Sequence, residues 1–508
     1  MFSKHPKGLV AAALSNMGER FGFYIMMAIL VLFLQAKFGL TGGQAGLIYS
    51  TFYFSIYILA LIGGIIADRT RNYKGTILTG IVMMAVGYLL LAIPTPTPVS
   101  NTALFLTISC VALAIIAFGN GLFKGNLQAL VGQMYDNKEY GKMRDSGFSL
   151  FYMFINIGAI FAPIVAVSVR GWWLGKFGYT YNADLPALCH GLLDGTLTPE
   201  ALATYQTMAS EAVKSGAPVT DLTQFANDYL NVFTTGFHYA FGVAILAMAI
   251  SLTVFIINKR RFPDPGKKNL DAKSDSATTT VKMDAAEVRQ RIYALLAVFA
   301  VVIFFWFSFH QNGLTLNLFA KEYTDLNLFG MPIAAELFQS LNPFFVVFLT
   351  PIVMAVFGWQ RAMGKEPSTP KKIAIGMGIA ATAFLVMTIG SYVSHLPLHS
   401  EVIAQGTSSV KVTPLLLLVT YLILTVAELY ISPLGISFVS KVAPPHLQGL
   451  MQGGWLGATG LGNQLLVIGA ILYEHIPIWM TWAVFVIACS ISMFTMLFML
   501  KWLERVAK

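Results

Sequence analysis

Twelve apolar segments constrain this chain more than any other feature of its sequence. Each is long enough to cross the hydrocarbon core of a bilayer, which takes ~20 helical residues. Their predicted limits are 8–36, 45–67, 76–94, 103–133, 144–168, 236–258, 291–320, 335–358, 371–394, 413–440, 447–473 and 477–501. Only 11% of the 508 residues are charged, whereas an average soluble domain has ~25%. These observations exclude a soluble enzyme, a disordered regulator and a coiled coil, and they predict an all-α polytopic membrane protein.

Lysine and arginine residues gather on one side of the predicted spans. With the N-terminus placed in the cytoplasm, 25 of the 33 fall on the cytoplasmic side, 6 fall on the other side, and Arg20 and Lys124 lie within spans. Cytoplasmic loops carry such an excess, so we expect a multi-pass protein of the plasma (inner) membrane with both termini in the cytoplasm. The same bias explains the net charge of +9 without a nucleic-acid partner.

Two polar segments interrupt the spans. Residues 259–290 are basic and poor in aromatic side chains, so we expect a flexible or amphipathic cytoplasmic linker between an N-terminal six-helix bundle, 1–258, and a C-terminal one, 291–508. The loop at about 169–235 is predicted to face outward, either as a partner or substrate surface or as an insertion without such a role. Within it, Thr198-Pro199-Glu200 is typical of a helix N-terminus, and the segment that follows is predicted to form a short helix pair.

Polar residues inside the spans repeat between the two halves. The first span of each half carries a polar cluster and the fourth span carries a single charge, as expected for a site on a pseudo-two-fold axis. The residues are Glu19, Arg20 and Lys124 in the first half, and His310, Gln311, Asn312 and Glu428 in the second. A charge within lipid costs about 2.5–3.5 kcal/mol or more unless it is paired or hydrated. The charges therefore indicate a water-filled pathway, with structural ion pairs as the alternative.

Helical spacing predicts how these charges are presented. Glu19 and Arg20 fall on neighbouring faces of one helix, so we expect each to find a partner on another helix rather than to face the other squarely. Lys124 lies among glycines that thin its helix and allow a neighbour or a ligand to approach. Glu428 precedes Pro433, which favours a bend in that span.

The loop after the second span reads GGIIADRTRNYKG, from Gly63 to Gly75. It resembles the loop signature of the major facilitator superfamily, a Gly-x-x-x-Asp-Arg core followed by basic residues. Asp68 and Arg69 are therefore interpreted as a conformational latch. Asp68 is expected to cap a helix N-terminus or to pair with an arginine of the other half, in one conformation only. The alternative is a basic loop that only sets topology.

Several segments together resemble one major facilitator subfamily, the proton-dependent oligopeptide transporters. GERFGFY (Gly18–Tyr24) resembles the family's ExxERFxYY stretch, and FYMFINIGAIFAP (Phe151–Pro163) resembles its fifth-span signature. GLFKGN, FWFSFHQNG, LNPFF and AELYISPLG resemble its fourth, seventh, eighth and tenth spans. The resemblance implies a major facilitator fold of twelve transmembrane helices in two halves.

The same resemblance implies a function and a role for each matching residue. The chain would be a proton-coupled secondary active importer of di- and tripeptides that works by alternating access. Glu19 and Arg20 would serve proton coupling, with Lys124 holding the peptide carboxylate or pairing with Glu19. Glu428 with Asn342 would receive the peptide amino terminus. The remaining cavity residues would be Tyr24, Tyr57, Asn156, Gln311 and Trp455.

The sequence departs from the family pattern at several motif positions. Asn16 replaces the first acid of ExxER, Met27 an arginine one turn after the motif, and Gly125 the proline of FKPN. His310 stands where many members have a seventh-span acid, and because a histidine changes charge near pH 6.5 we assign it to proton coupling. The departures leave open an alternative, a relative with a shifted substrate, such as an amino-acid conjugate or another organic anion, and weak or rerouted coupling.

Other classes of function are less favoured. No acid and histidine cluster has metal-ligand spacing and no serine lies in a nucleophile elbow, so we expect no enzyme, no metal and no cofactor. Cys110, Cys189 and Cys489 are not expected to form a disulfide framework. A receptor or scaffold that does not transport is disfavoured because Lys124 and Glu428 are both present. The expected partners are a small peptide, protons and the lipid bilayer, and the expected state is a monomer.

Overall fold

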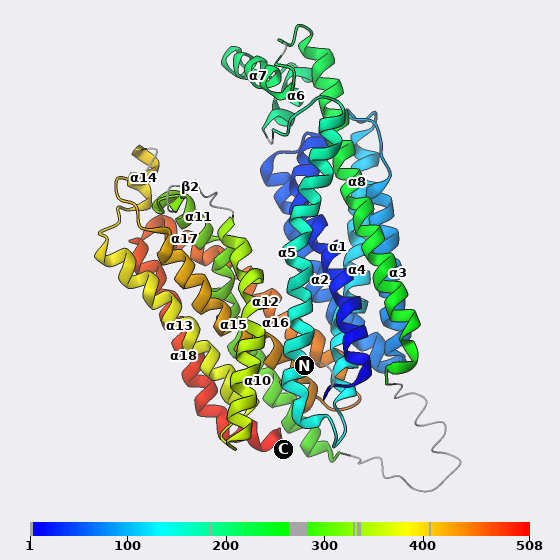
Figure 1. Ribbon diagram of the computed structural model, residues 1–508, viewed down its shortest axis with the longest axis vertical. Helices are drawn as coiled ribbons and strands as arrows, with labels where there is room; N and C mark the ends of the chain where they lie inside the picture. The colour runs from blue at the N-terminus through cyan, green and yellow to red at the C-terminus, as the bar shows by residue number, and fades with distance from the viewer. Residues whose placement is uncertain are drawn as a thin grey trace.

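The computed structural model describes residues 4–182, 184–216, 218–263, 283–328, 331–332, 337–405 and 408–507. Within these residues, twelve helical segments are long and apolar enough to cross a membrane, as the sequence predicts. They form two helical bundles that stand side by side (Figure 1). The first bundle consists of α1 (Lys7–Phe38), α2 (Gly42–Thr70), α3 (Tyr73–Ala92), α4 (Thr102–Met134), α5 (Arg144–Lys176) and α8 (Leu222–Ile257).

The second bundle contains two interrupted spans. Its helices are α10 (Ala285–Phe309), α11 (Thr315–Tyr323), α12 (Leu337–Ala362), α13 (Thr369–Val393), α15 (Pro414–Val442), α16 (Gln448–Gln464), α17 (Leu466–His475) and α18 (Ile478–Val506). The seventh span breaks between α10 and α11 at a 3₁₀ turn, η4 (His310–Gly313). The eleventh span breaks between α16 and α17 at Leu465. Both breaks lie where polar side chains enter the space between the bundles.

The molecule has two distinguishable ends. Both chain termini lie toward one end, which we call the terminal face, and α6, α7 and α14 lie at the opposite end, which we call the loop face (Figure 1). The terminal face also carries η2 (Gly141–Met143) and η3 (Lys259–Arg261). The loop face carries α14 (His399–Gln405) and a short antiparallel pair, β1 (Asn327–Leu328) and β2 (Met331–Pro332). Toward the loop face the two bundles diverge.

Contacts between the bundles follow a pseudo-two-fold pattern. The second span of the first bundle, α2, packs on the fifth span of the second bundle, α16. The equivalent pair with the halves exchanged, α5 and α12, also packs together. The polar pattern of the sequence is therefore matched by the arrangement of the helices.

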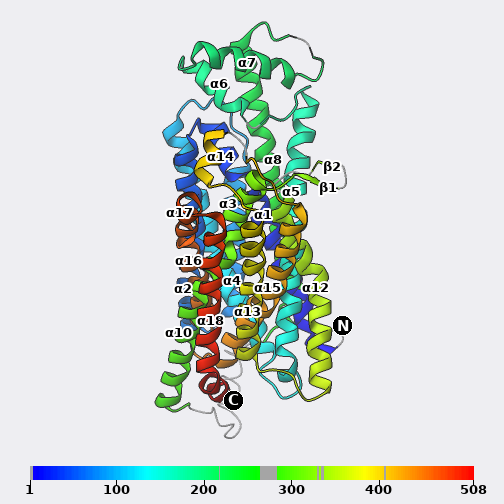
Figure 2. The same cartoon turned by 90° about the vertical axis from the view of Figure 1, so that its left-hand side faces the viewer.

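The loop between the fifth and sixth spans is shorter than the sequence suggests. We expected a loop over about 169–235, but α5 continues to Lys176 and α8 begins at Leu222. Only one helix, α7 (Pro199–Ala212), forms in the segment predicted as a helix pair; its partner is the earlier α6 (Leu185–Leu193). Thr198 does cap α7, accepting a hydrogen bond from the Ala201 amide. Figure 2 shows α6 and α7 above the ends of α5 and α8.

Side-chain contacts explain why α5 and α8 extend beyond the apolar region. The Tyr229 hydroxyl on α8 donates to the Thr180 carbonyl at 3.0 Å, and Tyr205 of α7 donates to Leu222. Hydropathy contains no information about such tertiary contacts, so the spans predicted from it are shorter than the helices α5 and α8.

The central linker is also shorter than predicted at its C-terminal end. Helix α10 begins at Ala285, so residues 285–290 belong to the seventh span and not to the linker. The remaining part of the linker that we expected to be flexible or amphipathic, residues 264–282, lies outside the described residues.

Small residues allow the bundles to meet closely toward the terminal face. A Cβ atom at Gly453 of α16 would lie 2.6 Å from the Ala60 carbonyl oxygen of α2. At Gly457, one turn further along α16, a Cβ atom would make an ordinary contact of 3.6 Å with Leu61. The backbones of α2 and α16 therefore approach to a distance that only glycine permits at position 453.

We predict that Gly453→Ala separates the bundles at the terminal face, because an added methyl group there costs about 1–3 kcal/mol of overpacking. The measurement is the distance between spin labels on Thr70→Cys and His446→Cys, in a Cys110→Ser background. It should lengthen in Gly453→Ala and stay unchanged in the matched variant Gly457→Ala. Equal distances in both variants would show that the glycine contact does not hold this face closed.

Candidate functional site

A cavity of about 840 Å³ lies between the two bundles and is lined by both. Most of the side chains predicted for the site reach it. These are Arg20, Tyr24, Tyr57, Lys124, Asn156, His310, Asn342, Glu428 and Trp455. Two predicted residues, Glu19 and Gln311, are fully buried and do not line the cavity.

Glu19 and Arg20 form an ion pair, which corrects the expectation that they could not face each other. The Arg20 guanidinium donates through Nε and Nη2 to both carboxylate oxygens of Glu19. Asn120 of α4 donates to the same carboxylate at 2.8 Å. Neighbouring side chains leave a helix ~100° apart, but the arginine side chain is long enough for its guanidinium to reach the Glu19 carboxylate. The spacing argument considered only where each side chain leaves the helix.

Lys124 enters the cavity from α4 without a partner among the described carboxylates. Its Nζ lies 5.2 Å from the centre of the Tyr57 ring. The carboxylate of Glu19, which the family resemblance offered as a partner, is taken by Arg20 and Asn120. A cation in this position is available to an anionic group in the cavity.

The glycines around Lys124 serve helix packing. A Cβ atom at Gly119 would lie 2.7 Å from the Gly80 carbonyl oxygen of α3, and one at Gly121 would lie 2.6 Å from that of Leu59 of α2. Gly125 faces Gly453 of α16. The glycines allow α4 to lie deep between its neighbours, and this places Lys124 at the interface of the bundles.

Glu428 lies on the opposite wall, on α15, and is held by both bundles. Asn342 of α12 donates to its Oε2 at 2.7 Å and also to Thr425 at 3.2 Å. The hydroxyl of Tyr152, on α5 of the first bundle, donates to its Oε1. The carboxylate is 4% exposed and has two neutral donors but no cation among the described residues. It is therefore suited to receive a positively charged group.

His310 and Gln311 both lie in the 3₁₀ turn that follows the end of α10 at Phe309, and their side chains point in different directions. The His310 ring stacks on Trp306, with centroids 4.8 Å apart, and its Nδ1 has no hydrogen-bond partner among the described residues. Gln311 turns away to donate to the carbonyls of Phe307 and Leu466, and its own oxygen accepts from Thr315. The expectation that Gln311 lines the cavity is therefore corrected.

A row of tyrosines on α2 forms part of the cavity wall, and the sequence analysis identified Tyr57 but not Tyr49 or Tyr53. Tyr49, Tyr53 and Tyr57 all line the cavity, and the Tyr57 hydroxyl donates to that of Tyr53 at 3.1 Å. The rings of Tyr49 and Tyr53 stack with centroids 6.2 Å apart. Their regular spacing of four residues was the available signal, because such residues share one helix face. Tyr152, Trp306 and Asn463 were also missed.

Asp68 makes one of the two contacts expected for it. Its carboxylate accepts hydrogen bonds from the backbone amides of Gly449 and Leu450, at 2.9 and 2.8 Å, in the first turn of α16. Tyr73 donates to the same carboxylate. An acid at a helix N-terminus satisfies free amides and meets the positive end of the helix dipole. Arg69, next to it, is exposed.

The described residues contain no group of three or more His, Cys, Asp or Glu side chains that could hold a metal ion. The three cysteines are free, and only Cys110 is exposed.

A family model described as the POT family matches residues 74–285 and 266–480 of the chain. The chain is 31% identical over 482 residues to the peptide transporter YePEPT of Yersinia enterocolitica, covering 91% of this chain and 87% of that relative. It is 28% identical to the dipeptide and tripeptide permease A of Chromobacterium violaceum, covering 86% and 79% of the two chains.

Among solved structures, a crystal structure of the peptide transporter POT in complex with sulfate covers all of this chain and 96% of its own. The TM-score is 0.61 and the sequence identity 23%. This likeness shows the fold, which is the major facilitator fold expected from the sequence.

We predict that Arg20→Ala destabilises the protein. Removing the cation leaves the Glu19 carboxylate buried with Asn120 as its remaining donor, and breaking a buried pair on one side costs about 3–5 kcal/mol. Thermal unfolding of the purified protein should show a lower melting temperature. Arg69→Ala, which removes an exposed arginine, is the control and should have no effect. The double variant Glu19→Gln/Arg20→Met should recover most of the loss, because it leaves no buried charge; a double variant as unstable as Arg20→Ala would contradict the role of the pair.

Proposed function

The chain belongs to the POT family, and on that premise we propose that it is a proton-coupled secondary active importer of di- and tripeptides that works by alternating access. One observation carries the proposal. Among the described residues, one cavity has a lysine without a counter-ion on one wall and a carboxylate held by neutral donors alone on the other, and the two come from different bundles.

A small peptide is a zwitterion, and these two groups complement its ends. The Lys124 ammonium binds the peptide carboxylate, and Glu428, positioned by Asn342, binds the peptide ammonium. The rest of the lining is amphipathic and binds peptides with varied side chains without discriminating between them. It includes Tyr24, Tyr57, Asn156 and Trp455. Gln311 acts indirectly, because it fixes the turn that presents His310.

Transport follows from rigid-body rocking of the bundles, residues 1–258 and 291–508, around this cavity. The helix cap from Asp68 and the contact at Gly453 hold the bundles together at the terminal face. With both termini in the cytoplasm, the structure corresponds to an outward-facing state. Asp68 acts as a latch that is broken when the terminal face opens, and Arg69 beside it is exposed and free to pair once the cap is lost.

Proton coupling is assigned to Glu19, Arg20 and His310. The Glu19 carboxylate takes up a proton only when Arg20 releases it, because the pair occupies both oxygens. His310 lines the cavity, and its Nδ1 is buried without a hydrogen-bond partner among the described residues, so a proton reaches it once water enters the site. Closure around the site removes water and favours release.

The alternative within the family is a relative with a shifted substrate, such as an amino-acid conjugate or another organic anion, with weak or rerouted coupling. It is supported by Met27, which packs partly buried against the core in place of a cation, and by His310 in place of an acid. In either case we propose a monomeric, multi-pass plasma (inner) membrane protein whose partners are its substrate, protons and lipid, with no nucleic acid, no cofactor and no enzymatic reaction.

The test of the proposal is uptake of a labelled dipeptide into proteoliposomes, with and without an imposed pH gradient. Accumulation that depends on the gradient is expected, and Lys124→Ala should abolish it while the purified protein remains folded. Accumulation of an organic anion in place of the dipeptide would favour the alternative, and no transport of either would refute both.

We predict that Glu428→Gln weakens transport of peptides with a free amino terminus about tenfold or more, because a charge-assisted hydrogen bond to the ammonium is lost. N-acetylated peptides, which carry no ammonium, should lose much less. The measurement is the concentration dependence of uptake for both peptide kinds, with Glu474→Gln, an exposed acid outside the cavity, as the control. Equal losses for both kinds would show that Glu428 does not bind the amino terminus.

We predict that His310→Gln abolishes gradient-driven accumulation but keeps counterflow exchange of substrate. Glutamine preserves hydrogen bonding and roughly the size of the side chain, yet it cannot take up a proton in this pH range. Both activities are measured in the same proteoliposomes, alongside Glu19→Gln. Accumulation that survives in His310→Gln but fails in Glu19→Gln would assign the proton path to Glu19 alone.

A further inference from the structure

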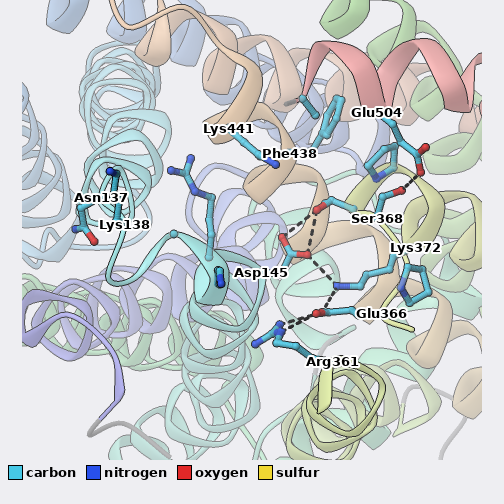
Figure 3. Close-up of a pocket in the computed structure, with 17 residues that line it drawn as sticks. Asn137, Lys138, Asp145, Arg361, Glu366, Ser368, Lys372, Phe438, Lys441 and Glu504 are labelled. Carbon is cyan, nitrogen blue, oxygen red and sulfur yellow. Dashed lines mark hydrogen bonds and ion pairs between the residues drawn. The ribbon is translucent and has the colours of Figure 1, made fainter. Parts of the chain in front are cut away.

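A second cavity, of about 870 Å³, lies at the terminal face and belongs to both bundles. From the first bundle it is lined by Arg144 and Asp145 at the start of α5. From the second bundle it is lined by the loop between α12 and α13 and by parts of α15 and α18 (Figure 3). The cavity therefore exists only while the two bundles meet at this face.

The acids nearest the interface are already satisfied by protein partners. Asp145 accepts hydrogen bonds from Lys372 at 2.9 Å, from Thr369 at 3.1 Å and from Ser437 at 2.5 Å. Lys372 also donates to Glu366 at 2.7 Å (Figure 3). The Arg361 guanidinium forms two hydrogen bonds with the Glu366 carboxylate, at 2.6 and 2.9 Å. These two acids and two bases neutralise one another.

Glu366 is charged in this arrangement. Burial alone would raise its pKa, but the hydrogen bonds from Arg361 and Lys372 outweigh burial and hold the pKa below its ordinary value. Arg144, the other arginine of the lining, pairs with Asp136 and donates to Ser440 across the interface. Its charge is therefore compensated as well.

Three lysines of the lining remain without an acidic partner among the described residues. Lys138 and Lys142 lie in the connection between α4 and α5, and Lys441 lies at the end of α15. In Figure 3 no dashed line joins Lys441 to another residue drawn. The remaining acid of the lining, Glu504, accepts a hydrogen bond from Ser368. The lining has six basic and three acidic residues, and once Arg144 is counted with Asp136, which lies outside the lining, an excess of two positive charges remains.

A topogenic role does not account for this convergence. The positive-inside rule requires basic residues on cytoplasmic loops, but it does not require their side chains to face the same space. Lys365 and Lys371 serve that rule equally well, since they are exposed on the same face, yet neither lines the cavity. The lysines that do line it come from both bundles and face one concave space.

We propose that this cavity is a binding site for a phosphate-bearing anion, with Lys138, Lys142 and Lys441 as the residues that recognise it. A doubly charged phosphate group matches the excess of two charges, and ammonium groups bind phosphate as point charges. The position at the terminal face makes two sources available, a free phosphate compound and the headgroup of an acidic phospholipid. The site lies apart from the central cavity and does not depend on what that cavity transports.

The site has a conformational consequence. An anion that binds only while the bundles meet at the terminal face stabilises that conformation, by an amount set by its concentration relative to its dissociation constant. The anion therefore acts as an effector that holds the terminal face closed.

The experiment compares two double variants that each remove two lysines from the same face. Lys142→Gln/Lys441→Gln alters the site, and Lys365→Gln/Lys371→Gln is the matched control. Inorganic phosphate is titrated against the purified protein in detergent, with chloride at equal ionic strength as the reference, and the melting temperature is followed. The distance between labels on Glu139→Cys and Met363→Cys, in a Cys110→Ser background, is then measured in phosphatidylcholine nanodiscs with and without phosphatidylglycerol.

In wild type, phosphate or phosphatidylglycerol should stabilise the protein and shorten the label distance. The site variant should bind about a hundredfold more weakly, because it loses two charged hydrogen bonds and each is worth about tenfold (~1.4 kcal/mol). The control should match wild type. A response to phosphate in detergent assigns the site to a soluble anion, and a response to phosphatidylglycerol alone assigns it to a lipid headgroup. No response to either, or equal losses in both double variants, would overturn the proposal. Lys441→Gln alone provides the same comparison if the double variant does not fold.

Discussion

Lipid offers no partner to a charge, and the placement of the four central charges Glu19, Arg20, Lys124 and Glu428 follows from that constraint. A charged side chain within a span must be paired inside the protein or exposed to a hydrated cavity. Glu19 and Arg20 are paired inside the protein, since they neutralise each other and are almost completely buried. Lys124 and Glu428 instead line the cavity, one from each bundle. The cavity between the bundles is therefore polar because Lys124 and Glu428 line it.

The contacts that close the terminal face differ in kind from those that line the cavity. Asp68 binds backbone amides, Gly453 meets a backbone carbonyl, and Asp145 binds Lys372 across the interface. Each contact needs the two bundles in one relative position. Such contacts stabilise a state without making it permanent, which suits bundles that exchange between two arrangements.

Tyr152 connects the two bundles at the central cavity. It lies on the first bundle but donates to Glu428 on the second, at the wall of the cavity. A ligand ammonium that binds Glu428 changes the electrostatic surroundings of this contact between bundles. The site therefore has a physical route by which occupancy influences how the bundles sit relative to each other, through one carboxylate shared between a ligand and the opposite bundle.

The sequence by itself predicted the twelve spans, their division into two halves, and nine of the side chains that line the cavity, because hydropathy and the cost of buried charge act on single segments. Only the tertiary structure decided the rest. The Glu19–Arg20 pair forms because the arginine side chain is long. The direction of Gln311 depends on the break in the seventh span. The ends of α5 and α8 depend on contacts with the segment that contains α6 and α7. The cavity at the terminal face depends on residues more than two hundred positions apart. Local patterns cannot specify these features, because each arises where separate helices meet.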